Sequence, residues 1–218
     1  MRAEFGTREL LLRTLGLLRA AAPRAAVTIV VLSAAGAAID SNVLGEDGGD
    51  ALSLILTIGT VGFQFWLTRA ALGDIGSAGR DSGRFGAFFL LGIVSTIAIL
   101  AGFVLLVLPG ILLLVRWWPA GAILLGDDAT LFGSLKESWR ETDGHFWTIF
   151  PLLLMLWVPA VLAAGAMFAA YGDGAAHPAS FVPLNLAMYG ATVAGWHLAV
   201  AAYSFMDGRS GSLDEIFS

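Results

Sequence analysis

Long runs of apolar residues, separated by short polar segments, make up most of the chain. A helix that crosses a bilayer needs about 20 apolar residues, and six of the runs approach or exceed that length. We therefore predict an all-α, polytopic transmembrane helix bundle that forms a single integral membrane domain over residues 1–218. The six predicted spans cover residues 25–42, 50–70, 85–107, 111–126, 145–171 and 183–206.

Two shorter segments, 7–22 and 130–142, combine leucines with charged residues at helical spacing. This pattern predicts amphipathic helices in the membrane interface, with leucines toward the acyl chains and basic side chains at the headgroups. An alternative for residues 7–22 is that they extend the first span. The side chains that we expect to contact lipid from these two helices are Arg8, Arg13, Lys136, Trp139 and Arg140.

The composition agrees with a membrane protein. Hydrophobic residues make up 57% of the 218 residues and charged residues only 13%, whereas soluble domains average about 25% charged residues. The chain has no cysteine, which excludes disulfides and thiolate metal sites. Its net charge of −5 argues against a nucleic-acid partner.

Basic residues mark one side of the predicted bundle. Of the twelve Lys and Arg residues, eleven fall in the N-terminal segment, in residues 69–84, in residues 127–145 or in the C-terminal tail. Six spans place these four regions on the same side, and the loops expected on the other side, 43–50, 108–110 and 172–182, contain no basic residue. Because basic loops remain in the cytoplasm, we predict that both termini are cytoplasmic.

Arg116 is the one basic residue outside those regions. It follows a Pro-Gly pair at 109–110, a strong turn signal, by six residues, which predicts a depth of about 9 Å below the outer surface. A charge at that depth needs a partner or a route to the headgroups. The expected neighbours are Asp40, Asn185 and Tyr189. Two interpretations stay open: a site for an anion or lipid headgroup, and an arginine that ties helices together or extends to the surface.

The chain has no sequence pattern typical of a catalytic centre, such as a P-loop or HExxH. His145, His177 and His197 have different predicted depths, so we do not expect a shared metal site. His197 could ligate a haem or pigment, but a lone histidine more often bonds to a neighbouring helix. We likewise expect the Gln64 side chain to form a hydrogen bond to a neighbouring helix rather than to bind a ligand. We therefore predict that the protein is not an enzyme and has no cofactor.

A recognisable pattern occupies residues 108–147. A Pro-Gly pair is followed by Arg-Trp, a proline, a Leu-x-x-Ser-Trp segment, and a glycine and an aromatic residue before the next apolar run. The pattern consists of Pro109, Gly110, Arg116, Trp117, Pro119, Leu135, Ser138, Trp139, Thr142, Gly144 and Trp147. It resembles a family of small bacterial membrane proteins named for the membrane domain attached to some glycerophosphoryl diester phosphodiesterases.

The resemblance implies a multi-pass protein of the bacterial inner membrane. The sequence shows no phosphodiesterase domain, so we do not expect that activity here. Gly126-Asp127-Asp128 also departs from the family, which usually has a differently placed acidic residue after this span.

Three hypotheses for function follow. The first is a non-enzymatic inner-membrane protein that serves as an envelope- or lipid-associated scaffold or as a membrane subunit of a larger assembly. The second is a small transporter or lipid-handling protein with a polar site around Arg116. The third is an accessory subunit of a respiratory or photosynthetic complex. The expected partners are membrane lipids and, in the first and third hypotheses, another membrane protein.

Overall fold

A computed structural model describes residues 5–43, 45–79, 83–171 and 178–206, which form helices and short connections with no strand among them. The predicted all-α fold is confirmed. In chain order the elements are α1 (Thr7–Ala20), α2 (Ala22–Asp40), α3 (Gly45–Asp74), α4 (Phe85–Leu105), α5 (Val107–Arg116), α6 (Ala120–Gly126), α7 (Leu131–Glu141), α8 (Phe146–Tyr171), the 3-10 turn η1 (Pro178–Ser180) and α9 (Phe181–Met206). Arg80, His177 and the polar tail lie outside the described residues.

Five stretches of the described chain are long and apolar enough to cross a membrane, which identifies a multi-pass membrane protein. They are α2, Asp47–Asp74 of α3, α4, the combined segment Val107–Gly126, and Phe146–Ala170 of α8. The sixth predicted span, α9, has sufficient length with 26 residues, but its polar residues keep it out of this group. These residues are tolerated because α9 packs against α1, α2, α3, α6 and α8 and so lies inside the bundle.

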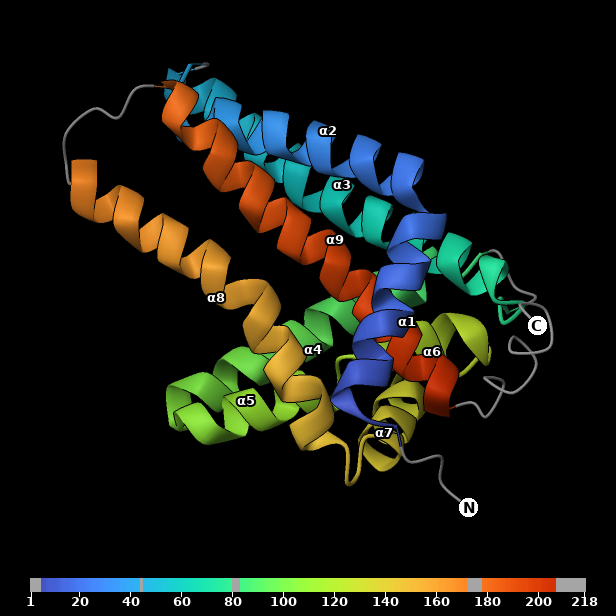
Figure 1. Cartoon of the computed structure of the whole chain (residues 1–218). Helices are drawn as coiled ribbons and strands as arrows, with labels where there is room; N and C mark the ends of the chain where they lie inside the picture. Colours follow the sequence, from blue (N-terminus) through green and yellow to red (C-terminus); the bar gives the residue numbers. More distant parts are fainter. Residues whose placement is uncertain (1–4, 44, 80–82, 172–177, 207–218) are drawn as a thin grey trace.

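The long helices form an antiparallel bundle. α2, α3 and α9 run side by side, α8 packs along α9, and α1 crosses the last turns of α9 (Figure 1). Arg24, at the start of α2, pairs with Asp74, at the end of α3, with 3.1 Å between nitrogen and oxygen. Asn185, near the start of α9, donates a 2.8 Å hydrogen bond to Asp40, at the end of α2. We call the end of the bundle with Asp74 and α7 the α7 end, and the end with Asp40 the opposite end.

α1 is a separate amphipathic helix at the α7 end, because the helix is interrupted at Ala21, two residues before Pro23, and α2 begins after it. It does not extend the first span, which was the alternative. Its side toward α8 and α9 buries Leu10, Thr14 and Leu17, while Leu12 and Leu15 are exposed on the outside. Of the two arginines expected to contact lipid, Arg8 is exposed. Arg13 differs from the prediction, because it points inward and donates a 3.3 Å hydrogen bond to Ser204 of α9.

A helix is present where segment 130–142 predicted one. It is α7, and the Thr130 hydroxyl caps its start by accepting a hydrogen bond from the Gly133 amide. Its buried side differs from the expected leucine face. Besides one leucine, that side carries hydroxyl residues, whereas the large apolar residues on the other side are open to the surroundings. The buried residues are Ser134, Leu135, Ser138 and Thr142, and the exposed ones include Phe132, Lys136, Trp139 and Arg140.

The predicted turn at residues 109–110 needs correction, and the predicted fourth span is present but divided into two helices. Pro109 and Gly110 lie in the first turn of α5, where proline is tolerated because the early amide hydrogens have no intrahelical partner. Leu106 alone connects α4 to α5. Residues 111–126 are not one straight helix, since α5 and α6 are separated at 117–119, next to Pro119. The cause is local, because proline has no amide hydrogen and clashes with the preceding turn.

The α4–α5 contact gives a test of this geometry. A Cβ atom on Gly102 would lie 3.0 Å from the Cα and N atoms of Gly110, and backbone atoms cannot move aside. We expect Gly102→Val to destabilise the protein by about 1–3 kcal/mol, the usual cost of overpacking. Gly59→Val on α3 is the control, because nothing lies within 4 Å of a Cβ atom there. The measurement is thermal unfolding in detergent, and equal melting temperatures for both variants would contradict the close contact.

Candidate functional site

The four residues expected to form one polar site lie in two places. Asp40, Asn185 and Tyr189 lie together at the opposite end of the bundle. Arg116 lies at the α7 end, where it pairs with Asp143 between α7 and α8. The prediction placed Arg116 by counting along a straight helix from a turn at residues 109–110. The connection is instead at Leu106, and the helix is broken at residues 117–119.

Arg116 is held by α7 through both its side chain and its backbone. Its guanidinium donates hydrogen bonds to Asp143 Oδ1 at 2.9 Å and to the Trp139 carbonyl at 3.1 Å. The same guanidinium lies 5.2 Å from the centre of the Trp139 ring, in a cation–π contact. The Arg116 carbonyl accepts hydrogen bonds from the hydroxyls of Ser138 at 2.6 Å and Thr142 at 3.3 Å. We call these five residues the Arg116 clamp.

The clamp follows from the helix break. In a continuous helix the Arg116 carbonyl would accept from the amide of residue 120, but the Ala120 amide donates to the Trp117 carbonyl instead. The break therefore leaves the Arg116 carbonyl free inside an apolar protein, where an unpaired carbonyl is costly. Ser138 and Thr142, one helical turn apart on α7, supply the missing donors. This explains why α7 buries hydroxyls rather than leucines.

Next to the clamp, Arg140 stays on the surface of α7. Glu141, which accepts a 3.0 Å hydrogen bond from Arg140, and Glu137 raise the pKa of its guanidinium. Arg140 and Lys136 are thus charged and exposed, as a headgroup contact requires.

At the opposite end, Asp40, Asn185 and Tyr189 border a cavity of about 280 Å³ between α2, α8 and α9. The Asn185 amide donates to Asp40 at 2.8 Å and to the Phe181 carbonyl at 3.0 Å. Gly36 of α2 makes room for this group, because a Cβ atom there would lie 2.1 Å from Asn185 Oδ1. The arrangement ties α2 to α9. With no basic residue on its wall, it does not form the expected anion site.

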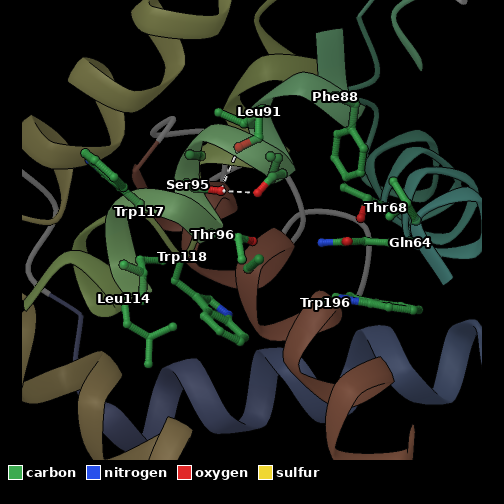
Figure 2. Close-up of a pocket in the computed structure, with 17 residues that line it drawn as sticks. Gln64, Thr68, Phe88, Leu91, Ser95, Thr96, Leu114, Trp117, Trp118 and Trp196 are labelled. Carbon is green, nitrogen blue, oxygen red and sulfur yellow. Dashed lines mark hydrogen bonds between the residues drawn. The ribbon is translucent and has the colours of Figure 1, made fainter. Parts of the chain in front are cut away.

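A second polar feature, which the sequence did not indicate, lies between the bundle and the α4–α5–α6 segment. It is a half-open groove of about 260 Å³ whose walls come from α3, α4, α5, α6 and α9. Figure 2 shows Gln64, Thr68, Thr96 and Trp196 around this space, with Trp117 and Trp118 on the α5–α6 side. We call it the amide groove, after Gln64.

Polar side chains in the amide groove come from two different helices. The Ser95 hydroxyl of α4 is satisfied within its own helix by the Leu91 carbonyl at 2.7 Å. Within the described part of the chain, the Gln64 amide and the Thr96 hydroxyl have no hydrogen-bond partner. The interhelix hydrogen bond expected for Gln64 is therefore not formed there. An amide can both donate and accept, so the groove offers a ligand several uncharged hydrogen-bonding groups.

Three tryptophans supply the apolar walls of the groove. Trp118 is fixed by a 3.0 Å hydrogen bond from its indole nitrogen to the Gly195 carbonyl of α9. Gly195 permits this contact, since a Cβ atom there would lie 2.8 Å from the Trp118 ring. Trp117, which precedes Trp118, and Trp196, which follows Gly195, also line the groove. The groove therefore has large flat apolar surfaces beside its polar groups, as ligand sites commonly do.

The surroundings of the groove are apolar. Gln64 lies ten residues before the end of α3, about 15 Å along the helix at 1.5 Å per residue. Ser95 and Thr96 lie near the middle of the 21 residues of α4. The exposed neighbours on α4 are apolar: Ile93, Ile97 and Leu100. No charged residue lines the groove.

The described residues show no group of three or more His, Cys, Asp or Glu side chains able to hold a metal ion. His197 is buried in α9, and its Nδ1 is bonded to the Val193 carbonyl of the same helix at 2.8 Å. It does not line the amide groove.

No family model, no curated protein and no solved structure matches this chain. The resemblance to the phosphodiesterase-associated membrane domain remains a prediction. Four of the positions that carry it, Arg116, Ser138, Trp139 and Thr142, belong to the Arg116 clamp, and a fifth, Pro119, lies at the helix break. The sequence pattern therefore corresponds to one structural unit in this protein.

The clamp can be tested by removing one hydroxyl. Ser138→Ala leaves the Arg116 carbonyl with only the longer bond from Thr142, and we expect a loss of about 1–3 kcal/mol, the cost of a buried group left unpaired. Ser134→Ala is the matched control, since the equally buried Ser134 hydroxyl donates to the Leu131 carbonyl of its own helix. Thermal unfolding would show a clearly lower melting temperature for Ser138→Ala. Equal values for the two variants would mean that the clamp contributes nothing.

Proposed function

We propose that the protein is a non-enzymatic lipid-handling membrane protein that binds an uncharged amphiphile in the amide groove. The observation that carries the proposal is the Gln64 amide, which lies within a span, faces the groove and has no partner among the described residues. An unpaired amide in an apolar setting costs about 1–3 kcal/mol by protein mutational data. A ligand with a carbonyl or hydroxyl group would remove that cost.

The walls favour a neutral ligand over a charged one. With no charged residue on the groove wall, a phosphate or an ammonium group would be desolvated there without a counter-charge. Ester carbonyls and a free hydroxyl, as in a diacylglycerol, match an amide and hydroxyls. The volume of about 260 Å³ fits the glycerol-ester region of such a lipid, with acyl chains extending past the exposed apolar residues of α4.

For the location we propose the bacterial inner membrane with both termini in the cytoplasm. The resemblance and the basic residues at the α7 end support this orientation. The start of α1 and the end of α9 lie at the same end, where Phe5 stacks on Phe205 with 4.9 Å between ring centres. The scaffold or membrane-subunit hypothesis and the respiratory or photosynthetic hypothesis stay predictions.

A substitution that fills the groove tests the proposal. Gly92 lines the groove, and nothing lies within 4 Å of a Cβ atom placed on it, so leucine can enter the space without disturbing the packing. We expect Gly92→Leu to lose most of the neutral lipid that co-purifies in mild detergent, as measured by native mass spectrometry and lipid extraction. Gly59→Leu, equally free of contacts but outside the groove, should retain it. Equal lipid content in both variants would contradict the proposal.

Gln64→Leu gives an independent test. Without lipid this variant should unfold at a higher temperature than the unchanged protein, because an unpaired amide has been replaced by an apolar group. Added diacylglycerol should stabilise the unchanged protein, as any ligand specific to the folded state does, and should stabilise Gln64→Leu less. The control ligand is phosphatidylglycerol, whose charge the groove does not match. If both lipids stabilise both proteins equally, the amide does not take part in binding.

A further inference from the structure

The α4–α5 hairpin is attached to the rest of the protein at the α7 end. Arg116, the last residue of α5, is fixed there by the clamp. The other clamp residues, 138–143, directly precede α8 in the sequence. The other arm is attached nearby, since Arg84, which precedes α4, donates a 2.9 Å hydrogen bond to the Leu124 carbonyl at the end of α6. Both arms of the hairpin thus begin at the same end of the bundle.

The length of α5 limits how far the hairpin reaches. α5 has ten residues, so its start lies about 15 Å from Arg116 at 1.5 Å per residue. The hydrocarbon core of a bilayer is about 30 Å thick, whereas the 26 residues of α8, which begin beside the clamp, cover about 39 Å. Figure 1 shows α4 and α5 running at a steep angle to α2, α3 and α9, with their tip well away from the far ends of α2 and α8.

The residues at the tip are apolar and exposed. No polar side chain occurs between residues 103 and 108, although a loop at a membrane surface usually contains some. The connection between α2 and α3, at the opposite end, instead contains Ser41 and Asn42. The exposed fractions at the tip are 86% for Val104, 77% for Leu105, 68% for Leu106, 61% for Val107 and 79% for Leu108.

The backbone of the tip also suits an apolar medium. Leu106 is the single connecting residue, and its amide donates a 3.0 Å hydrogen bond to the Gly102 carbonyl. Pro109, in the first turn of α5, has no amide hydrogen and so removes one donor that would lack an intrahelical partner. The two helices touch at Gly102 and Gly110, so no side chain separates their backbones there. Few backbone groups remain to be satisfied.

We infer that α4 and α5 form a re-entrant hairpin, which enters the bilayer from the α7 end and stops near its middle. Its tip, Val104–Leu108, is a lipid-binding surface for the acyl chains of the leaflet at the α7 end. The hairpin does not cross the membrane, although α4, and α5 taken together with α6, are each long and apolar enough to do so. This inference does not depend on a lipid in the amide groove.

Depth measurement with spin labels tests the inference directly. The chain has no cysteine, so single-cysteine variants need no prior removal of native thiols. Leu106→Cys reports on the tip, Ile58→Cys on the middle of α3, Val43→Cys on the opposite end and Lys136→Cys on the surface of α7. All four positions are exposed, so a label does not disturb the core. The labelled proteins are reconstituted in phosphatidylcholine–phosphatidylglycerol vesicles, and collision rates with oxygen and with a water-soluble nickel chelate are measured.

A re-entrant hairpin predicts that the oxygen-to-nickel collision ratio at Leu106 matches that at Ile58 and is several-fold higher than at Val43 and Lys136. A ratio at Leu106 equal to that at Val43, with high nickel accessibility, would show a hairpin that spans the bilayer. A ratio equal to that at Lys136 would show a hairpin on the surface. Either result overturns the inference.

A second pair of variants does not require labelling. Leu106→Lys would place a charge in the bilayer interior if the hairpin is re-entrant, and the yield of folded protein should fall several-fold. Val43→Lys, in the connection between α2 and α3, should be tolerated. Equal yields of the two lysine variants would mean that Leu106 lies at a membrane surface and would overturn the inference.

Discussion

The carbonyl of Arg116 is the group on which the arrangement of this half of the protein depends. A helix break inside a membrane protein leaves backbone groups that neither water nor lipid can satisfy. Here the break next to Pro119 frees that carbonyl. The hydroxyls of Ser138 and Thr142 donate hydrogen bonds to it in place of the missing amide. Because both hydroxyls are on α7, the break, α7 and the start of α8 must lie together. The ion pair with Asp143 and the stacking on Trp139 add to a contact that the backbone already requires.

The position of the amide groove follows from the same contact. With α5 held at the α7 end, the α4–α5 hairpin diverges from α3 and α9 instead of packing along their full length (Figure 1). Trp118 fixes the near edge of the resulting space to α9 through the Gly195 carbonyl. The groove therefore lies where the hairpin leaves the bundle, and a re-entrant hairpin would open it to the leaflet at the α7 end. Binding in the groove and insertion of the tip would then involve the same layer of lipid.

Long-range features were the ones that the sequence could not predict. Apolar run length was sufficient for the all-α fold and for the position of most helices, and the amphipathic pattern was sufficient for α1 and α7 as separate elements. The placement of Arg116 beside Asp40, Asn185 and Tyr189 was wrong because it was counted from Pro109 and Gly110. Proline in the first turn of a helix leaves the same local signal as proline in a turn. The groove was missed because Gln64, Thr96 and Trp118 lie on different helices, and no spacing along the chain relates them. The buried hydroxyls of α7 were missed for a similar reason, since their partner is a backbone carbonyl on another helix.

The polar side chains that already have hydrogen-bond partners, and those that do not, indicate where a ligand would gain the most binding free energy. The described basic side chains of the interior are paired near helix ends, as in Arg24 with Asp74 and Arg116 with Asp143. The polar groups at the opposite end are also bonded, through Asp40 and Asn185. Among the described residues, the buried Ser33 hydroxyl and His197 Nε2 also have no partner. Neither lines the amide groove, where the uncharged Gln64 amide and the Thr96 hydroxyl lie beside three tryptophans. Pairing that amide is worth about 1–3 kcal/mol, roughly a factor of 5 to 150 in affinity. A headgroup with a full charge would lose more by desolvation than it gained, which is the reason for proposing an uncharged ligand.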